Sequence, residues 1–134
     1  MMWRVKYEKR SDSMEENAMA TRHCLALDLH DDPETIAAYR RWHAPGGPPA
    51  AVTESIRRAG ILDMQIWLTG PRLFMIMETG PDFSPEAKAA ADAADADVQA
   101  WEALMGKLQK ALPWAAPGEK WTPAEQIFSL AEQP

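Results

Sequence analysis

The stretch "ILDMQIWLTGPRLFMIMET", residues 61–79, decides the fold of this chain. Two short apolar runs, residues 61–68 and 72–79, flank the turn "TGP", and a glycine between two such runs is typical of a β-hairpin. Side chains alternate along a strand, so the apolar even-numbered residues Leu62 to Leu68 should share one face. The odd-numbered residues Ile61 to Trp67 should share the other, more polar face. The stretch therefore predicts two antiparallel strands with one face packed against a core.

The residues before the hairpin predict a further strand and two helical pieces. "RHCLALDLH", residues 22–30, alternates leucine with smaller or polar residues, which is the period of a strand. In "DDPETIAAYRRWH", residues 31–43, Asp32 is a candidate N-cap and Pro33 suits the first helical position. The loop "APGGPP" interrupts this helix. Residues 50–59 then predict a second piece that ends at Gly60.

The residues after the hairpin complete the order of elements. The alanine-rich residues 84–112 predict one broken helix or two consecutive ones, with Ser84 and Asp95 or Asp97 as possible caps. A closing strand is expected near Gln126 to Leu130. The order strand, helix, strand, strand, helix, strand is that of an α+β ferredoxin-like sandwich, in which helices cover one face of a four-stranded antiparallel sheet. The uncovered face predicts pairing with a second copy, which gives a dimeric α/β barrel.

Length and charge limit the organisation and the partners of the chain. Its 134 residues suit one domain, for which we expect residues 21–134, after a flexible charged extension at residues 1–20. A formal net charge of -6 argues against nucleic acid and anionic membranes as partners. No apolar run reaches the roughly 18 residues of a membrane span, and the N-terminus does not resemble a secretory signal. Together with a single cysteine, Cys24, these features favour a cytoplasmic protein.

Tyr39 and His43 are the first candidates for chemistry. They lie four residues apart, so a helix would place them on one face. Histidine is the side chain that titrates near neutral pH, and a tyrosine hydroxyl can donate or accept a proton, so the pair could serve a proton-transfer reaction. The spacing alone favours the simpler alternative, in which both residues are packing contacts of an amphipathic helix.

Other candidates carry weaker signals. Asp63 and Glu78 occupy strand positions where a carboxylate is either exposed or part of a site. Trp67 and Trp101 belong to a set of six tryptophans, which suit either core packing or the apolar side of a flat ligand such as a sugar. His23 and His30 have no partner at metal-ligand spacing, so we expect no metal site. Nucleotide-binding and serine-nucleophile motifs are missing, and we expect no cofactor.

Four segments together resemble the L-rhamnose mutarotase family, and especially its L-fucose branch. They are "DDPETIAAYRRWH", "AGILDMQIWLTGPRLFMIMET", "VQAWEALM" and "WAAPGEKWTPAEQIFSL", within residues 23–130. The resemblance implies a dimeric ferredoxin-like barrel. It also implies a cofactor-free isomerase that interconverts the α and β anomers of a 6-deoxy-L-hexose, L-fucose or L-rhamnose.

The resemblance also implies roles for single residues. His43 would be the main acid/base and Tyr39 its partner, while the ring of Trp101 would pack on the sugar. Glu102 stands where the rhamnose-acting branch has a tryptophan, which favours L-fucose. Asp63, Trp67 and Glu78 are further candidates for sugar contact. The chain departs from the family in "APGGPP", which replaces an aromatic Trp-Pro after the histidine, and in Trp67, which replaces a tyrosine.

Two alternatives remain open at this point. One is a dimeric α+β barrel monooxygenase-like enzyme, which would need a larger apolar cavity. The other is a non-catalytic dimeric sugar-binding module, in which Tyr39 and His43 only pack.

Overall fold

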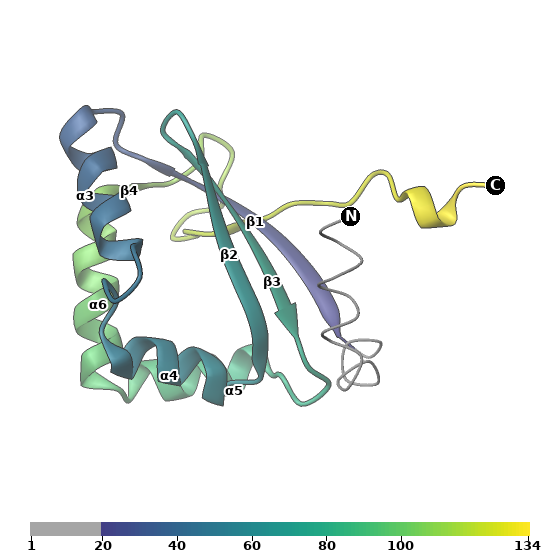
Figure 1. The fold of residues 1–134 in the computed structure, drawn as a ribbon, viewed down its shortest axis with the longest axis horizontal. Coiled ribbons are helices and arrows are strands. Elements are labelled where there is room, and N and C mark those ends of the chain that lie inside the picture. The colour runs from purple at the N-terminus through teal and green to yellow at the C-terminus, as the bar shows by residue number, and fades with distance from the viewer. Residues whose placement is uncertain (1–19) are drawn as a thin grey trace.

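A computed structural model describes residues 20–134, so the predicted flexible extension lies outside the described residues except for Ala20. The fold is mixed α+β, as the sequence predicts (Figure 1). Its elements follow in this order: β1 (Thr21–Leu29), α3 (Pro33–His43), α4 (Ala50–Arg58), β2 (Ile61–Thr69), β3 (Arg72–Thr79), α5 (Pro85–Ala93), α6 (Ala96–Leu108), β4 (Gln109–Lys110), β5 (Thr122–Pro123) and the 3-10 turn η2 (Leu130–Glu132).

The sheet is antiparallel and has the strand order β2-β3-β1-β4, with β5 also paired to β1. This is the order of a ferredoxin-like sheet, in which the first strand lies between the hairpin and the last strand. The fourth position is shared by two short strands, because β4 pairs with one end of β1 and β5 with its middle. The helices gather on one side of the sheet (Figure 1).

Three predicted caps start the helices as expected. The Asp32 carboxylate accepts a hydrogen bond from the Thr35 backbone N–H at 2.7 Å and so begins α3. Ser84 caps α5 and Asp95 caps α6 in the same way. Each cap satisfies a backbone donor that has no partner within its helix. The alanine-rich segment is therefore two helices, which Ala94 and Asp95 separate.

The alternation predicted for the first hairpin strand is wrong at its start. A β-bulge lies between Ile61 and Asp63, where Ile61 pairs with Thr79 and Asp63 pairs with Glu78. The extra residue, Leu62, moves Ile61 to the helix-covered face, where it is buried, and leaves Leu62 exposed. From Asp63 onward the predicted alternation holds.

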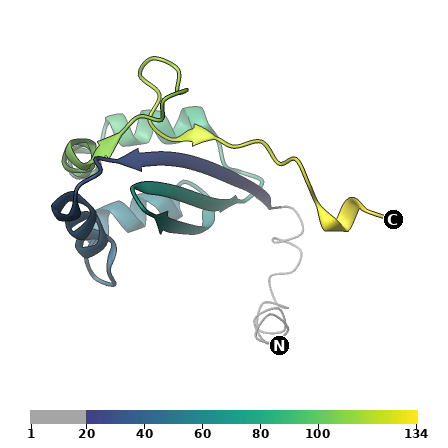
Figure 2. The same ribbon diagram turned by 90° about the horizontal axis from the view of Figure 1, so that it is seen from above.

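The prediction of a closing strand at residues 126–130 is also wrong. The backbone pairs with β1 only at Thr122–Pro123, and the Ala124 N–H donates to the Cys24 carbonyl at 2.8 Å. Beyond that point the tail leaves the body of the protein (Figures 1 and 2). A strand needs a neighbour for its N–H and C=O groups, and these residues find none in the described part of their own chain.

The core lies between the sheet and the helices. Its fully packed members are Leu29, Tyr39, Leu73 and Met105, which come from β1, α3, β3 and α6. None of the helices of residues 20–134 covers the opposite face of the sheet. Trp67 and Phe74 point there, since they alternate with the core residues Leu68 and Leu73. Tyr39 is thus buried on the covered face, next to the end of α3.

Candidate functional site

Tyr39 and His43 stack on each other in the last turns of α3. Their ring centroids are 4.0 Å apart and the ring planes differ by 25°. The helix ends at His43 because the loop "APGGPP" folds back on it. The Gly47 N–H donates to the Ala44 carbonyl at 2.7 Å, and a Cβ at Gly47 would lie 2.5 Å from the Trp42 carbonyl oxygen. The loop therefore needs a glycine there, and it fixes the end of α3 that carries the histidine.

One hydrogen bond determines which nitrogen of His43 can act as a base. His43 Nδ1 lies 2.7 Å from the Tyr39 backbone carbonyl oxygen, which can only accept. Nδ1 therefore carries the proton of the neutral ring, and Nε2 keeps a free lone pair. Burial of the ring lowers the pKa of His43 below its ordinary value of 6.5, although the bond to the carbonyl opposes this shift. At neutral pH the ring is uncharged and ready to accept a proton at Nε2.

The hydroxyl of Tyr39 is a proton donor at neutral pH, whereas His43 is a base. Burial raises its pKa above the ordinary value of 10.0, because the phenolate would lose its hydration. The hydroxyl oxygen accepts a hydrogen bond from Gln109 Nε2 at 3.5 Å, which opposes the rise. Tyr39 therefore keeps its proton at neutral pH. One helix face presents a base and a proton donor side by side.

Two tryptophans form an aromatic wall beside the pair. Trp101, on α6, lies 5.5 Å from His43 between ring centroids, at an interplanar angle of 61°. Trp42 meets the edge of Trp101 at 5.9 Å and 81°. Trp42 lies in the last turn of α3, next to His43, and supplies an aromatic ring near the "APGGPP" loop, where the expected Trp-Pro is missing.

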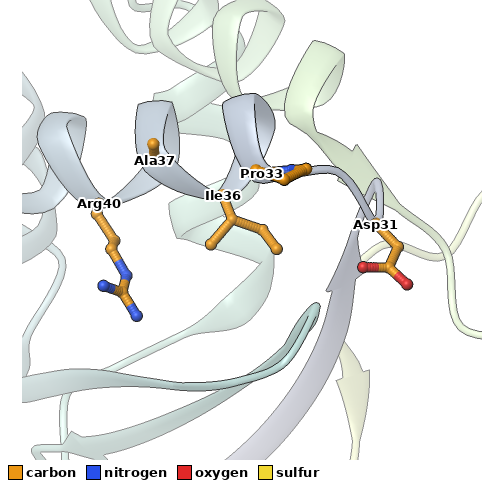
Figure 3. Close-up of a pocket in the computed structure, with 5 residues that line it drawn as sticks. All are labelled: Asp31, Pro33, Ile36, Ala37 and Arg40. Carbon is orange, nitrogen blue, oxygen red and sulfur yellow. The ribbon is translucent and has the colours of Figure 1, made fainter.

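A hollow of about 380 Å³ opens along the neighbouring face of α3 (Figure 3). Ile36 and Arg40 point from the helix toward the sheet, with Pro33 and Asp31 at the other end. Ile36 also packs against the core cluster that contains Tyr39. Tyr39, His43 and Trp101 do not line this hollow, so it is separate from the stacked pair.

Glu102 is exposed on α6, and its carboxylate accepts a long hydrogen bond from Gln99, at 3.4 Å. It adjoins Trp101 in sequence, yet the structure gives it no contact with Tyr39 or His43.

The structure does not bring Asp63, Trp67 and Glu78 to the pair. They lie on the open face of the sheet and interact with their own neighbours. Glu78 forms an ion pair with Arg22 at 3.0 Å, and Trp67 donates to Gln65 at 3.2 Å, while Gln65 donates to Asp63 at 3.5 Å. The sheet therefore separates these three residues from Tyr39, His43 and Trp101.

Sequence reasoning missed two residues of the site, Gln109 and Trp42. A signal for Trp42 existed, because it is three residues after Tyr39 on the same helix. Gln109 had no such signal, since it lies in β4 beyond the end of α6, and its contact with Tyr39 depends on how α6 packs against α3.

Within residues 20–134, no three His, Cys, Asp or Glu side chains gather as a metal site requires. No helix of the described chain is long and apolar enough to cross a membrane. The chemistry that the site itself supports is proton transfer, with a neutral imidazole, a protonated phenol and an aromatic wall.

Comparisons with known proteins find a family and relatives, some of which are named as sugar mutarotases. A family model described as L-rhamnose mutarotase matches residues 22–130. A protein named L-fucose mutarotase, from Xanthomonas campestris pv. campestris, is 53% identical over 111 residues, which are 83% of this chain and 89% of that protein. A UPF0734 protein of Dictyostelium discoideum is 32% identical over 109 residues, 78% of this chain and 86% of its own.

A solved structure resembles the fold. The crystal structure of an L-rhamnose mutarotase from Formosa agariphila superposes with a TM-score of 0.59 at 16% sequence identity. The match covers 82% of this chain and 98% of that one. At this identity the likeness concerns the fold alone.

Proposed function

We infer that this chain, which belongs to the L-rhamnose mutarotase family, is a carbohydrate epimerase that interconverts the α and β anomers of a 6-deoxy-L-hexose. Family membership favours this activity over the monooxygenase-like and non-catalytic alternatives. The observation that carries the proposal for the site is the stacked pair Tyr39 and His43, in which a hydrogen bond leaves Nε2 of the histidine free.

The proposed reaction needs two proton transfers at one carbon. His43 Nε2 takes the proton of the anomeric hydroxyl while the Tyr39 hydroxyl gives its proton to the ring oxygen. The bond between C1 and the ring oxygen breaks, and C1 becomes the aldehyde carbon of the open chain. After rotation about the C1–C2 bond, the ring hydroxyl attacks the other face of the aldehyde. The ring hydroxyl returns its proton to Tyr39, and protonated His43 returns its proton to the new anomeric hydroxyl.

The aromatic wall is the proposed binding surface for the sugar. The C–H groups of a pyranose form an apolar patch that packs well on an indole ring, and Trp101 lies next to His43. We propose that Trp42 extends this wall. Glu102, one residue beyond Trp101, is proposed to accept a hydrogen bond from a sugar hydroxyl. Sugar contact by Asp63, Trp67 and Glu78 stays a prediction, and it requires that a sugar bind on the open face of the sheet.

The proposed preferred sugar is L-fucose. The 53% identical relative bears the name of an L-fucose mutarotase. Glu102, in place of the tryptophan of the rhamnose-acting branch, gives the same preference. The lone Cys24 is proposed to stay reduced in the cytoplasm.

A homodimer is proposed from the exposed apolar groups. Trp67 is 59% exposed on the open face, and Ile127, Phe128 and Leu130 on the departing tail are 91%, 63% and 77% exposed. Such groups favour an interface. A second copy presents the same face and tail, so a twofold axis would bury both sets at once. The expected result of light scattering after gel filtration is twice the mass of the 14.9 kDa chain.

Anomer-exchange NMR tests the activity directly. Saturation of one anomeric proton of L-fucose should transfer to the other anomer faster with the protein than without it, and more so for L-fucose than for L-rhamnose. D-glucose serves as the control sugar and should show no acceleration. Equal exchange with and without protein for both deoxy sugars would contradict the proposed function.

A further inference from the structure

The hydroxyl of Tyr39 has one polar partner among the hydrogen bonds of the described residues, and that partner is Gln109. The rest of the core cluster around Tyr39 consists of apolar or aromatic side chains, among them Leu29, Leu73, Trp101 and Met105. His43 on the same helix is the titratable group that faces the tyrosine ring. In such apolar surroundings a hydrogen bond is electrostatically stronger than in water, so one donated by an amide strongly affects the hydroxyl that accepts it.

The backbone of Gln109 is held from two sides. Its N–H donates to the Met105 carbonyl and ends α6, and in β4 it pairs with Leu29 of β1. Leu29 is itself a fully buried member of the cluster that contains Tyr39. The side chain of Gln109 is half-buried and reaches the Tyr39 hydroxyl from this fixed base. Its position is therefore set by the fold and not by a flexible loop.

The direction of the hydrogen bond matters for the reaction. Gln109 Nε2 donates and the hydroxyl oxygen accepts. A phenol has one proton, so a hydroxyl that accepts from Gln109 keeps that proton for another acceptor. The ring oxygen of a pyranose can only accept, and it is the group that must be protonated when the ring opens. The distance of 3.5 Å leaves room for the contact to shorten when a substrate is bound.

We propose that Gln109 is a positioning residue for the mutarotation: its carboxamide donates to the Tyr39 hydroxyl oxygen and keeps the hydroxyl proton directed to the ring oxygen of the sugar. This role rests on the proposed function and adds to it a residue outside α3. As the ring opens, negative charge grows on the tyrosine oxygen, and the donated hydrogen bond stabilises that charge. When the ring closes, the same bond keeps the oxygen ready to take its proton back.

The test measures Tyr39 directly. The chain has two tyrosines, Tyr7 and Tyr39, so a Tyr7→Phe background leaves Tyr39 as the only phenol. Ultraviolet difference titration then follows its ionisation, with far-UV circular dichroism confirming the fold at each pH. Removing the donor in Gln109→Met should raise the titration midpoint by at least about half a pH unit. Gln109→Glu should raise it further, because a carboxylate accepts the hydroxyl proton and repels the phenolate.

Kinetics at neutral pH give the second readout. Gln109→Met should lower kcat about tenfold with KM changed less than about twofold, since the lost bond acts mainly as the ring opens. Gln109→Glu should be at least as slow. Gln99→Met is the matched control for the titration: it removes a hydrogen bond from the same helix, to the Asp92 carbonyl, and should leave the Tyr39 midpoint unchanged.

The outcomes separate this role from the activity itself. If the unmodified protein accelerates anomer exchange but Gln109→Met moves neither the midpoint nor kcat, Gln109 has no positioning role and the proposed function stands. If the unmodified protein gives no acceleration, the proposed function is wrong and the role of Gln109 in it is wrong too, whatever the titration gives. Should Gln109→Met not fold, Gln109→Glu keeps the size of the side chain and decides the question alone.

Discussion

The two faces of the sheet carry similar residue types but organise them differently. On the covered face, Tyr39 and His43 stack and meet Trp101 from another helix, and burial shifts the pKa values of both titratable groups. On the open face, Asp63 and Glu78 sit among polar neighbours on adjacent strands, with Trp67 exposed. Proton-transfer chemistry needs groups that are close together and partly removed from water. The covered face meets both conditions, and there burial shifts the pKa values of both Tyr39 and His43.

Removing the base on the covered face should have the largest effect. His43→Ala is expected to slow anomer exchange by about 100- to 10,000-fold, the usual contribution of a general acid or base. The fold should remain, because the side chain is half-buried at the end of α3 and its hydrogen bond is made within the helix. Exchange NMR with L-fucose measures the rate.

His30→Ala is the matched control, since His30 is exposed and lies outside the stacked pair. It should keep the rate of the unmodified protein. A folded His43→Ala protein with a rate within about threefold of the original would show that the base lies elsewhere and that the covered face does not supply it.

Removing the acid should have the second largest effect. Tyr39→Phe keeps the ring that stacks on His43 and fills the core, and it removes only the hydroxyl. We expect kcat to fall about 100-fold with a small change in KM, because water protonates the ring oxygen less effectively than a positioned phenol. Thermal unfolding should change by only a few degrees. A Tyr39→Phe enzyme with an unchanged kcat would assign the proton donor to another group.

The sequence predicts the covered face better than the open one, and the reasons are physical. Helix caps at Asp32 and Ser84 act within a few residues, so local sequence is enough to place them. The bulge at Leu62 and the missing strand at residues 126–130 depend on what the neighbouring strand or another chain offers, and periodicity carries no such information.

The site residues also differ in whether the sequence alone can predict them. The i, i+4 spacing of Tyr39 and His43 is visible in the sequence, and so is their common helix face. That Gln109 meets the Tyr39 hydroxyl follows only from the packing of α6 and β4 against α3 and β1. The separation of Asp63 from His43 also follows only from the sheet.

Substitutions on the open face should weaken the proposed dimer. Trp67→Ser removes the largest exposed aromatic group of that face, and a tryptophan at the centre of an interface often contributes about 2 kcal/mol or more. The dissociation constant of the proposed dimer should therefore rise at least about 30-fold, as measured by sedimentation over a concentration series. Leu62→Ser, at the bulge on the edge of the sheet, is the control and should change the constant much less. A Trp67→Ser protein that dimerises like the original would place the interface elsewhere.

The pH dependence should give the smallest effect and should arise from the covered face alone. Because the pKa of folded His43 lies below 6.5, the acid decline of kcat/KM should have its midpoint below pH 6.5, and kcat/KM should fall about tenfold per unit once the ring is protonated. The raised pKa of Tyr39 places the alkaline decline above pH 10. Stopped-flow polarimetry of pure α-L-fucose over this range measures both limits.

The lowered pKa of His43 also predicts the direction in which the free energy of unfolding changes with pH. Between pH 6.5 and the lower pKa of folded His43, the unfolded chain binds a proton that the folded chain does not, so the free energy of unfolding must fall as pH falls. His43→Gln has no titrating ring, so its unfolding free energy should fall less over that window than that of the original protein. Equal slopes for His43→Gln and the original protein would mean that His43 is not held neutral by burial, and the covered face would then lose the property that distinguishes it from the open one.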